Sequence, residues 1–184
     1  MATGRAVLTA EKFLAMPEDN TRRYELLDGE LIVSPMPVPL HQRIVGRLFV
    51  LLDAHVRVHG LGEVFVSPIA VVLAKASVVG PDLVYVAADR AALVKDRAIE
   101  GAPTQLIEVS SPSTRRLDRR RKFELYARHG VPHYWIVETD EHAIEAYELG
   151  AGAYRLALRA AGEDLVTLPP FDDLSFVPES IWRS

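Results

Sequence analysis

The 184-residue chain carries a net charge of −4, with 49% hydrophobic and 25% charged residues, which are ordinary values for one globular domain. It contains no cysteine, so disulfides and cysteine-ligated zinc are excluded. Residues 1–5 lack the apolar core of a signal peptide, and no apolar run approaches the roughly 18 residues of a membrane span. We therefore expect a cytoplasmic protein without a membrane segment.

The first third of the chain predicts a helix, a β-hairpin and a second helix. Residues 8–16 have the pattern of a short helix, which a proline ends. Two apolar segments within 23–34 flank Asp28-Gly29, a pair that suits the two-residue type I′ turn of a hairpin. Apolar residues then recur at steps of three and four over 41–59, which predicts a longer helix.

The middle of the chain predicts strands of a covered sheet. A strand is predicted at 63–73. The stretches at 78–86 and 104–110 are short, rich in β-branched residues and bounded by Pro, Gly or Ser, so both are predicted as strands. A crossover that contains a helix is predicted at 87–101, followed by a strand at 104–110. The runs at 78–86 and 104–110 are apolar on both faces, which indicates interior strands covered by helices.

The last third predicts a basic helix that begins at 111–114 and ends at Gly130, then a strand at 133–137 and a second hairpin at 143–158. The predicted fold class is therefore α/β or α+β, a mixed β-sheet flanked by helices. The expected organisation is one domain over 1–184, with a core at about 41–137, an N-terminal helix and hairpin at 8–34, and a C-terminal hairpin and tail at 138–184.

Two carboxylates inside the apolar strands indicate a functional site. Asp82 heads one strand, and Glu108 lies near the end of the other. An ionised carboxylate in a sheet interior costs several kcal/mol unless a cation, a lysine or a proton neutralises it. Carboxylate-held Mg²⁺ neutralises such groups and also produces the nucleophilic water that phosphodiester hydrolysis requires. The carbonyl of Val109 is close enough in sequence to be a further oxygen ligand. Structural roles stay open: Asp82 could cap a turn, and Glu108 could pair with an arginine.

A positive stripe contrasts with the negative net charge. Between Arg115 and Arg128, seven basic residues stand against two acidic ones, a local charge of +5 (7 − 2). Such a stripe can hold phosphates while the remaining surface repels them. A solvated helix face is the alternative interpretation. The nucleic-acid-binding candidates are Arg115, Arg116, Arg119, Arg120 and Arg121.

Seven short motifs occur in a specific order along nearly the whole chain. They are Tyr24–Leu31, Ser34-Pro35, His41-Gln42, Pro81–Val84, Glu108–Thr114, Lys122–Tyr126 and Gly130–Trp135. In this order they resemble the Uma-type restriction endonucleases, a family of the PD-(D/E)XK nuclease superfamily. The resemblance implies a restriction-endonuclease-like fold and Mg²⁺-dependent cleavage of nucleic acid, with Mn²⁺ as a substitute and DNA favoured over RNA.

The resemblance places the PD of the superfamily on Pro81-Asp82 and its second acid on Glu108. The superfamily lysine then falls on Ser110, which is a departure from the pattern. Lys122 is the only one of the four lysines on the element that follows the Glu108 strand. We therefore interpret Lys122 as a migrated catalytic lysine, with a lone surface lysine as the alternative.

Two further residues complete the expected site. Glu25 corresponds to the additional upstream acid of similar nucleases, and His41 is a candidate phosphate contact. A solvent-facing glutamate and a histidine that only begins a helix are the structural alternatives. A homodimer would supply two sites for cutting two strands. The alternative function is a catalytically inactive nucleic-acid-binding or interaction module that retains the nuclease fold.

Overall fold

The larger of two main sheets has six strands and is mixed. The computed structural model describes residues 8–17, 19 and 21–183, and the other positions of the predicted domain lie outside the described residues. Strands β8 and β9 run parallel, whereas the other neighbours run antiparallel. In spatial order the strands are β11 (Ala153–Ala161), β10 (Ala143–Gly150), β9 (His133–Glu138), β8 (Gln105–Ser110), β6 (Leu83–Ala87) and β3 (Gly62–Val66).

The smaller sheet contains the predicted N-terminal hairpin. Asp28 and Gly29 have φ values of 52° and 81°, so both turn residues lie in the left-handed region that a type I′ turn requires. The hairpin joins the middle of the chain where Leu26 pairs with Val78. In spatial order the strands are β2 (Glu30–Ser34), β1 (Arg23–Leu27), β5 (Ser77–Val79), β4 (Val71–Ala74) and β7 (Ile99–Glu100).

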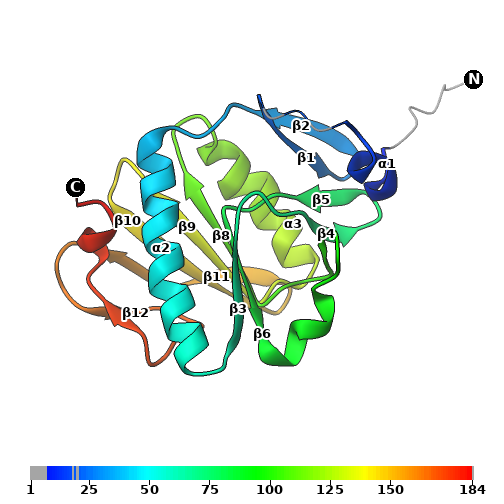
Figure 1. Cartoon of the computed structure of the whole chain (residues 1–184). Helices are drawn as coiled ribbons and strands as arrows, with labels where there is room; N and C mark the ends of the chain where they lie inside the picture. Colours follow the sequence, from blue (N-terminus) through cyan, green and yellow to red (C-terminus); the bar gives the residue numbers. More distant parts are fainter. Residues whose placement is uncertain (1–7, 18, 20, 184) are drawn as a thin grey trace, which may run out of the picture.

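Helices cover both faces of the larger sheet (Figure 1). Helix α2 (Pro39–Val58) packs on one face, where it meets Ile107 of β8, and α3 (Phe123–Arg128) packs on the other, where it meets Leu106. No helix within the described residues has the length and apolar character to cross a membrane. The remaining elements are α1 (Ala10–Leu14), the π-helical η2 (Leu117–Lys122), the 3-10 helices η1 (Ala88–Leu93) and η3 (Pro178–Ile181), and the ribbon β12 (Val166–Thr167) with β13 (Ser175–Phe176).

Two strand predictions were wrong in extent, because the chain changes sheet inside each segment. Segment 63–73 is split: β3 belongs to the larger sheet and β4 to the smaller one, with Ser67-Pro68 between them. Proline cannot donate a ladder hydrogen bond, so it fits a break rather than an interior strand. The stretch 78–86 is likewise split into β5 and β6 by Gly80–Asp82. Asp82 therefore lies where the chain crosses between the sheets.

The C-terminal hairpin is part of the main sheet. Strand β10 pairs with β9 along six residues, and β11 pairs with β10 to form the sheet edge. The sheet around the predicted core 41–137 thus extends through the segment 143–161. Helix-covered faces and a mixed sheet confirm the predicted fold class.

Candidate active site

Strand pairing brings Asp82 and Glu108 to the same place. Leu83 pairs with Ile107 in the antiparallel ladder of β6 and β8, so the residue before Leu83 and the residue after Ile107 lie opposite one another. Asp82 is 2% exposed and Glu108 is 3% exposed. Side-chain alternation puts Glu108 on the face of Leu106, which α3 covers. Both carboxylates are therefore buried, and that of Glu108 lies beneath the basic helix.

Lys122 joins Glu108 to two more acids. Its Nζ lies 2.9 Å from Glu108 Oε1, 3.0 Å from Glu25 Oε1 and 3.8 Å from Asp118 Oδ1. The hydroxyl of Tyr126 donates a second hydrogen bond to Glu108 Oε1 at 2.6 Å. Lys122 is buried, and Glu108 pairs with this lysine rather than with an arginine. The side chains of Lys122 and Glu25 thus point into the interior. The alternatives of a surface lysine and a solvent-facing glutamate are therefore wrong.

The helix that carries Lys122 has an irregular turn. Leu117–Lys122 is π-helical and continues directly into α3. A π segment widens the helical turn, and such segments occur frequently at functional sites. Asp118 and Lys122 are buried within it, whereas Arg116 and Arg120 are exposed. The irregular turn thus carries one acid and one base into the site from a strongly basic segment.

A second set of contacts surrounds Asp82. Arg23 Nη1 lies 2.8 Å from Asp82 Oδ1, and His41 Nε2 lies 3.1 Å from Oδ2. The backbone N–H of Val109 also donates to Oδ2, at 2.8 Å. Arg23 Nη2 donates to the Gly80 carbonyl at 2.5 Å, so this arginine fixes both the carboxylate and the crossing between the sheets. Asp82 is an ion-paired acid and more than a turn cap.

The two opposed carboxyl groups differ in their protonation. Burial works against the charge of Asp82, but the hydrogen bond with His41 and the charge of Arg23 keep the pKa of Asp82 below its usual value. Burial raises the pKa of Glu108 to about 8, although Lys122 acts in the opposite direction. In the metal-free protein at neutral pH, Asp82 is therefore ionised and Glu108 holds a proton.

Neighbouring acids control the other groups. Burial opposes the charge of Lys122, but Glu108, Glu25 and Asp118 together raise its pKa. Burial raises the pKa of Asp118. Lys122 thus keeps its ammonium charge.

The donor set fits a hard divalent cation. Four carboxylates are buried here, Glu25, Asp82, Glu108 and Asp118. If a bound cation drove off the remaining protons, four ionised acids against the cations Lys122 and Arg23 would leave a charge of −2 (−4 + 2). Mg²⁺ would balance that charge, and it prefers carboxylate oxygen. Among the described residues no cluster of three or more His or acidic side chains has metal-holding geometry, so a bound Mg²⁺ would need oxygens of water or phosphate as further ligands.

These residues face a common cavity of about 400 Å³. Its walls also include the loop from Ser34 to Val38 and the turn Ser111–Thr114, which precedes the basic helix. The four acids and Lys122 therefore line one cavity. The proposed site residues that line the cavity are Glu25, His41, Asp82, Glu108, Val109 and Lys122.

The raised pKa of Glu108 predicts that the stability of the metal-free protein depends on pH. Its pKa is about 8 in the folded protein, against an ordinary value of 4.5, so the folded state binds this proton more tightly. Stability therefore falls as pH rises from about 4.5 to about 8. Glu108→Gln removes this loss and should raise the free energy of unfolding at pH 8 by on the order of a few kcal/mol. Thermal melts of the wild type and Glu108→Gln in EDTA, at pH 5 and pH 8, test this prediction. If the stabilities of the two proteins change equally with pH, the prediction is wrong.

Two arginines of the positive stripe form ion pairs with a buried glutamate. Arg115 and Arg119 both bind Glu138, which is fully buried, through their Nε atoms at 2.9 and 2.7 Å. Arg119 also lies 2.9 Å from Glu145. These arginines neutralise acids of β9 and β10 and hold the helix on the sheet.

The other three arginines lie on the surface. Arg121 pairs with Glu30 of β2 at 2.8 Å, between two exposed side chains. Arg116 and Arg120 are exposed, and neither forms an ion pair with a described residue. Sequence alone does not separate these roles, because the partners come from strands far along the chain.

A family model described as "Uma2: Putative restriction endonuclease" matches residues 10–178. The chain belongs to the Uma2 family. A solved structure with a similar fold is that of a putative nuclease of the DUF820 family from Anabaena variabilis, with a TM-score of 0.78 and 20% sequence identity over 95% of this chain and 97% of that chain. No curated protein matches the chain. At this identity the structural likeness shows the fold, while the Uma2 match places the chain among nucleases.

Three residues of this Uma2 site were not predicted as such: Arg23, Asp118 and Tyr126. Arg23 stands two positions before Glu25 on one strand, a spacing that puts both side chains on one face. Asp118 and Tyr126 stand four residues before and after Lys122, which is neighbouring spacing on a helix. These spacings are the signals that could have found all three.

Proposed function

We propose that this Uma2 protein is a Mg²⁺-dependent endonuclease that hydrolyses phosphodiester bonds in DNA. One observation supports this proposal most strongly: Asp82 and Glu108 lie opposite one another on neighbouring strands, next to Lys122, in the lining of one cavity. Mg²⁺ is commonly held by one or two carboxylates, with waters and phosphate oxygens in the remaining positions. Mn²⁺ suits the same oxygen ligands and is the expected substitute.

The proposed metal ligands are Asp82 and Glu108, with the carbonyl of Val109 as a further oxygen. When bound, the ion supplies charge neutralisation at the phosphate and a more acidic water. Lys122 then provides a compact ammonium next to Glu108, where it can stabilise charge on the scissile phosphate or orient the attacking water. Glu25 positions that ammonium from 3.0 Å, and its own Oε1 is held by the N–H of Gly80 at 2.9 Å.

His41 is a proposed phosphate contact beside the metal ligands. Its Nε2 is against Asp82, and its buried Nδ1 has no hydrogen-bond partner among the described residues. A buried nitrogen without a partner is costly. When the imidazole carries both protons, Nδ1 would donate to a substrate phosphate oxygen and that cost would be removed. Arg23 acts through Asp82 as a positioning residue.

A cleavage assay tests the proposed activity. The chain is incubated with supercoiled plasmid, linear duplex, single-stranded DNA and RNA, each with Mg²⁺, Mn²⁺ or EDTA. We expect internal cuts in DNA with either metal and none in EDTA. Binding without cleavage under every condition would instead support the catalytically inactive module.

Measuring the solution mass with and without DNA tests the proposed homodimer, which would present one site to each strand.

Arg116 and Arg120 are expected to contribute to phosphate binding through charge alone. Replacing both with Ala should weaken binding to all DNA sequences equally and reduce the log–log salt slope by roughly 0.9 per lost contact. Arg119→Ala should instead lower the melting temperature, because Glu138 loses one of its partners. Fluorescence anisotropy over a salt series measures the slope. A slope unchanged in the double variant would show that these side chains form a solvated face.

A further inference from the structure

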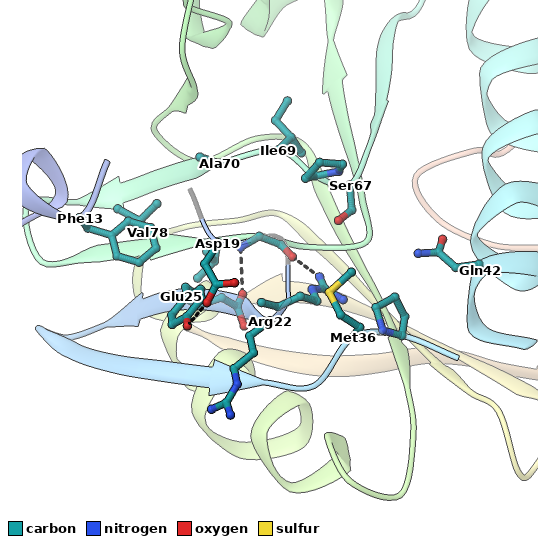
Figure 2. Close-up of a pocket in the computed structure, with 16 residues that line it drawn as sticks. Phe13, Asp19, Arg22, Glu25, Met36, Gln42, Ser67, Ile69, Ala70 and Val78 are labelled. Carbon is teal, nitrogen blue, oxygen red and sulfur yellow. Dashed lines mark hydrogen bonds between the residues drawn. The ribbon is translucent and has the colours of Figure 1, made fainter. Parts of the chain in front are cut away.

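A second cavity, of about 570 Å³, lies beside the catalytic one. Figure 2 shows it between the hairpin, the segment from Ser67 to Ala70, and Gln42 of α2. Its volume falls within the roughly 300–1,000 Å³ of small-molecule sites. The two cavities share four lining residues, Arg23, Glu25, Met36 and Pro37. A strand whose phosphate reaches Asp82 could therefore extend a neighbouring nucleotide into the second cavity.

The walls of this cavity are largely apolar. They come from α1, β5, the loop after β2 and the segment between β3 and β4. Nucleobases stack on aromatic side chains irrespective of their identity, because every base has a π-face. The aromatic side chains of this lining are Phe13 and Tyr24. The apolar lining residues are Phe13, Met36, Pro37, Pro68, Ile69, Ala70, Val78 and Val79.

The charges at this cavity disfavour a phosphate. Asp19 accepts hydrogen bonds from the backbone and hydroxyl of Thr21, at 2.9 and 2.6 Å, and from the hydroxyl of Tyr24 at 2.6 Å. Asp19 and Glu25 balance the arginines Arg22 and Arg23, which leaves no net positive charge in the lining. A neutral, flat group is thus a better occupant than an anion.

Gln42 supplies the polar edge that a flat neutral group needs. It is exposed on α2, and its amide extends towards the cavity in Figure 2. A glutamine amide offers a donor and an acceptor side by side, which match the N6 and N7 edge of adenine. Its neighbour His41 lines the catalytic cavity, so one helix turn serves both cavities.

We propose that this second cavity, the base pocket, takes an unstacked nucleobase of the substrate, with adenine as the best match. This inference rests on the proposed function, because it places the base next to the scissile phosphate. Extruding a base costs least where it is mismatched or already single-stranded. The base pocket therefore predicts a preference for adenine at one fixed distance from the cut, in unpaired rather than paired DNA.

Nuclear magnetic resonance tests the base pocket without any cleavage. The isotope-labelled chain is titrated in EDTA with adenosine 5′-monophosphate, and separately with inorganic phosphate. We expect shifts of the Gln42 side-chain amide and the Ile69 and Val78 methyl groups with the nucleotide only. Gln42→Ala should weaken nucleotide binding about tenfold, while Arg43→Ala, next on α2 and outside the cavity lining, should not. Equal shifts with phosphate, or no shifts at these groups, overturn the proposal.

Cleavage of a random-sequence single-stranded pool gives an independent readout. Sequencing the products of the wild-type chain should show adenine enriched at one position. Gln42→Ala should lose this enrichment, whereas Arg43→Ala should keep it. Nucleotide binding at Gln42 without any cleavage would refute the proposed function and leave the base pocket in place. Cleavage with no enrichment in either protein would refute the base pocket alone.

Discussion

Asp82→Asn and Glu108→Gln are each expected to reduce Mg²⁺-dependent DNA cleavage by at least about 10³-fold. A bound metal contributes several kcal/mol of charge stabilisation, and each factor of ten in rate corresponds to about 1.4 kcal/mol. The two acids lie opposite one another across β6 and β8, so each variant removes one side of the proposed ion site. Initial cleavage rates under saturating Mg²⁺ measure the effect.

The two variants should differ in stability, which separates chemistry from folding. Glu108→Gln should keep or improve the stability of the metal-free protein, because the glutamic acid is already held protonated. Asp82→Asn should lower it, because Arg23 and His41 lose a charged partner. Controls for the two are the exposed Asp89→Asn and Glu124→Gln. A variant of either site acid that cuts at the control rate removes that acid from the site.

Lys122→Ala is expected to lower the turnover by about 10²–10³, the loss found when one donor to transition-state charge is removed. Metal affinity should remain, because the proposed ligands are unchanged. Lys122→Arg should not restore full activity, since a planar guanidinium does not replace a compact ammonium. Ser110→Lys in the Lys122→Ala background should recover part of the rate, because Ser110 is on the same strand face as Glu108.

Stability must be measured beside the rate for this lysine. Removing Lys122 leaves its buried partners Glu25 and Asp118 without this cation, and removing one partner of a buried ion pair costs about 3–5 kcal/mol. Lys122→Met keeps the apolar stem and removes only the charge, and the exposed Lys95→Ala is the control. Wild-type turnover in a folded Lys122→Met variant would show that the ammonium has no catalytic role.

Local sequence predicted the elements whose signals are local. The Asp28-Gly29 turn and the apolar repeat of α2 each determine an element within a few residues. Asp82 and Glu108 were identifiable because an acid inside an apolar strand requires a neutraliser nearby. The neutraliser itself, Lys122, required the family pattern and its departure at Ser110.

Elements set by distant contacts could not be predicted. An apolar run has the same sequence pattern whether it stays in one sheet or crosses between two sheets. The break between β5 and β6 at Gly80–Asp82 was therefore not predicted. The π-helical turn leaves no periodic signal in six residues. Sequence alone does not distinguish Arg115 and Arg119 from the exposed Arg116, because their partner Glu138 is far along the chain and lies next to them only in the folded structure.

A crystal structure with Mn²⁺, recorded at a wavelength where manganese scatters anomalously, tests the metal assignment most directly. The account predicts an anomalous peak in contact with carboxylate oxygens of both Asp82 and Glu108, and no such peak in Glu108→Gln. A chain that cleaves DNA with Mn²⁺ but binds the ion away from these two acids would contradict it.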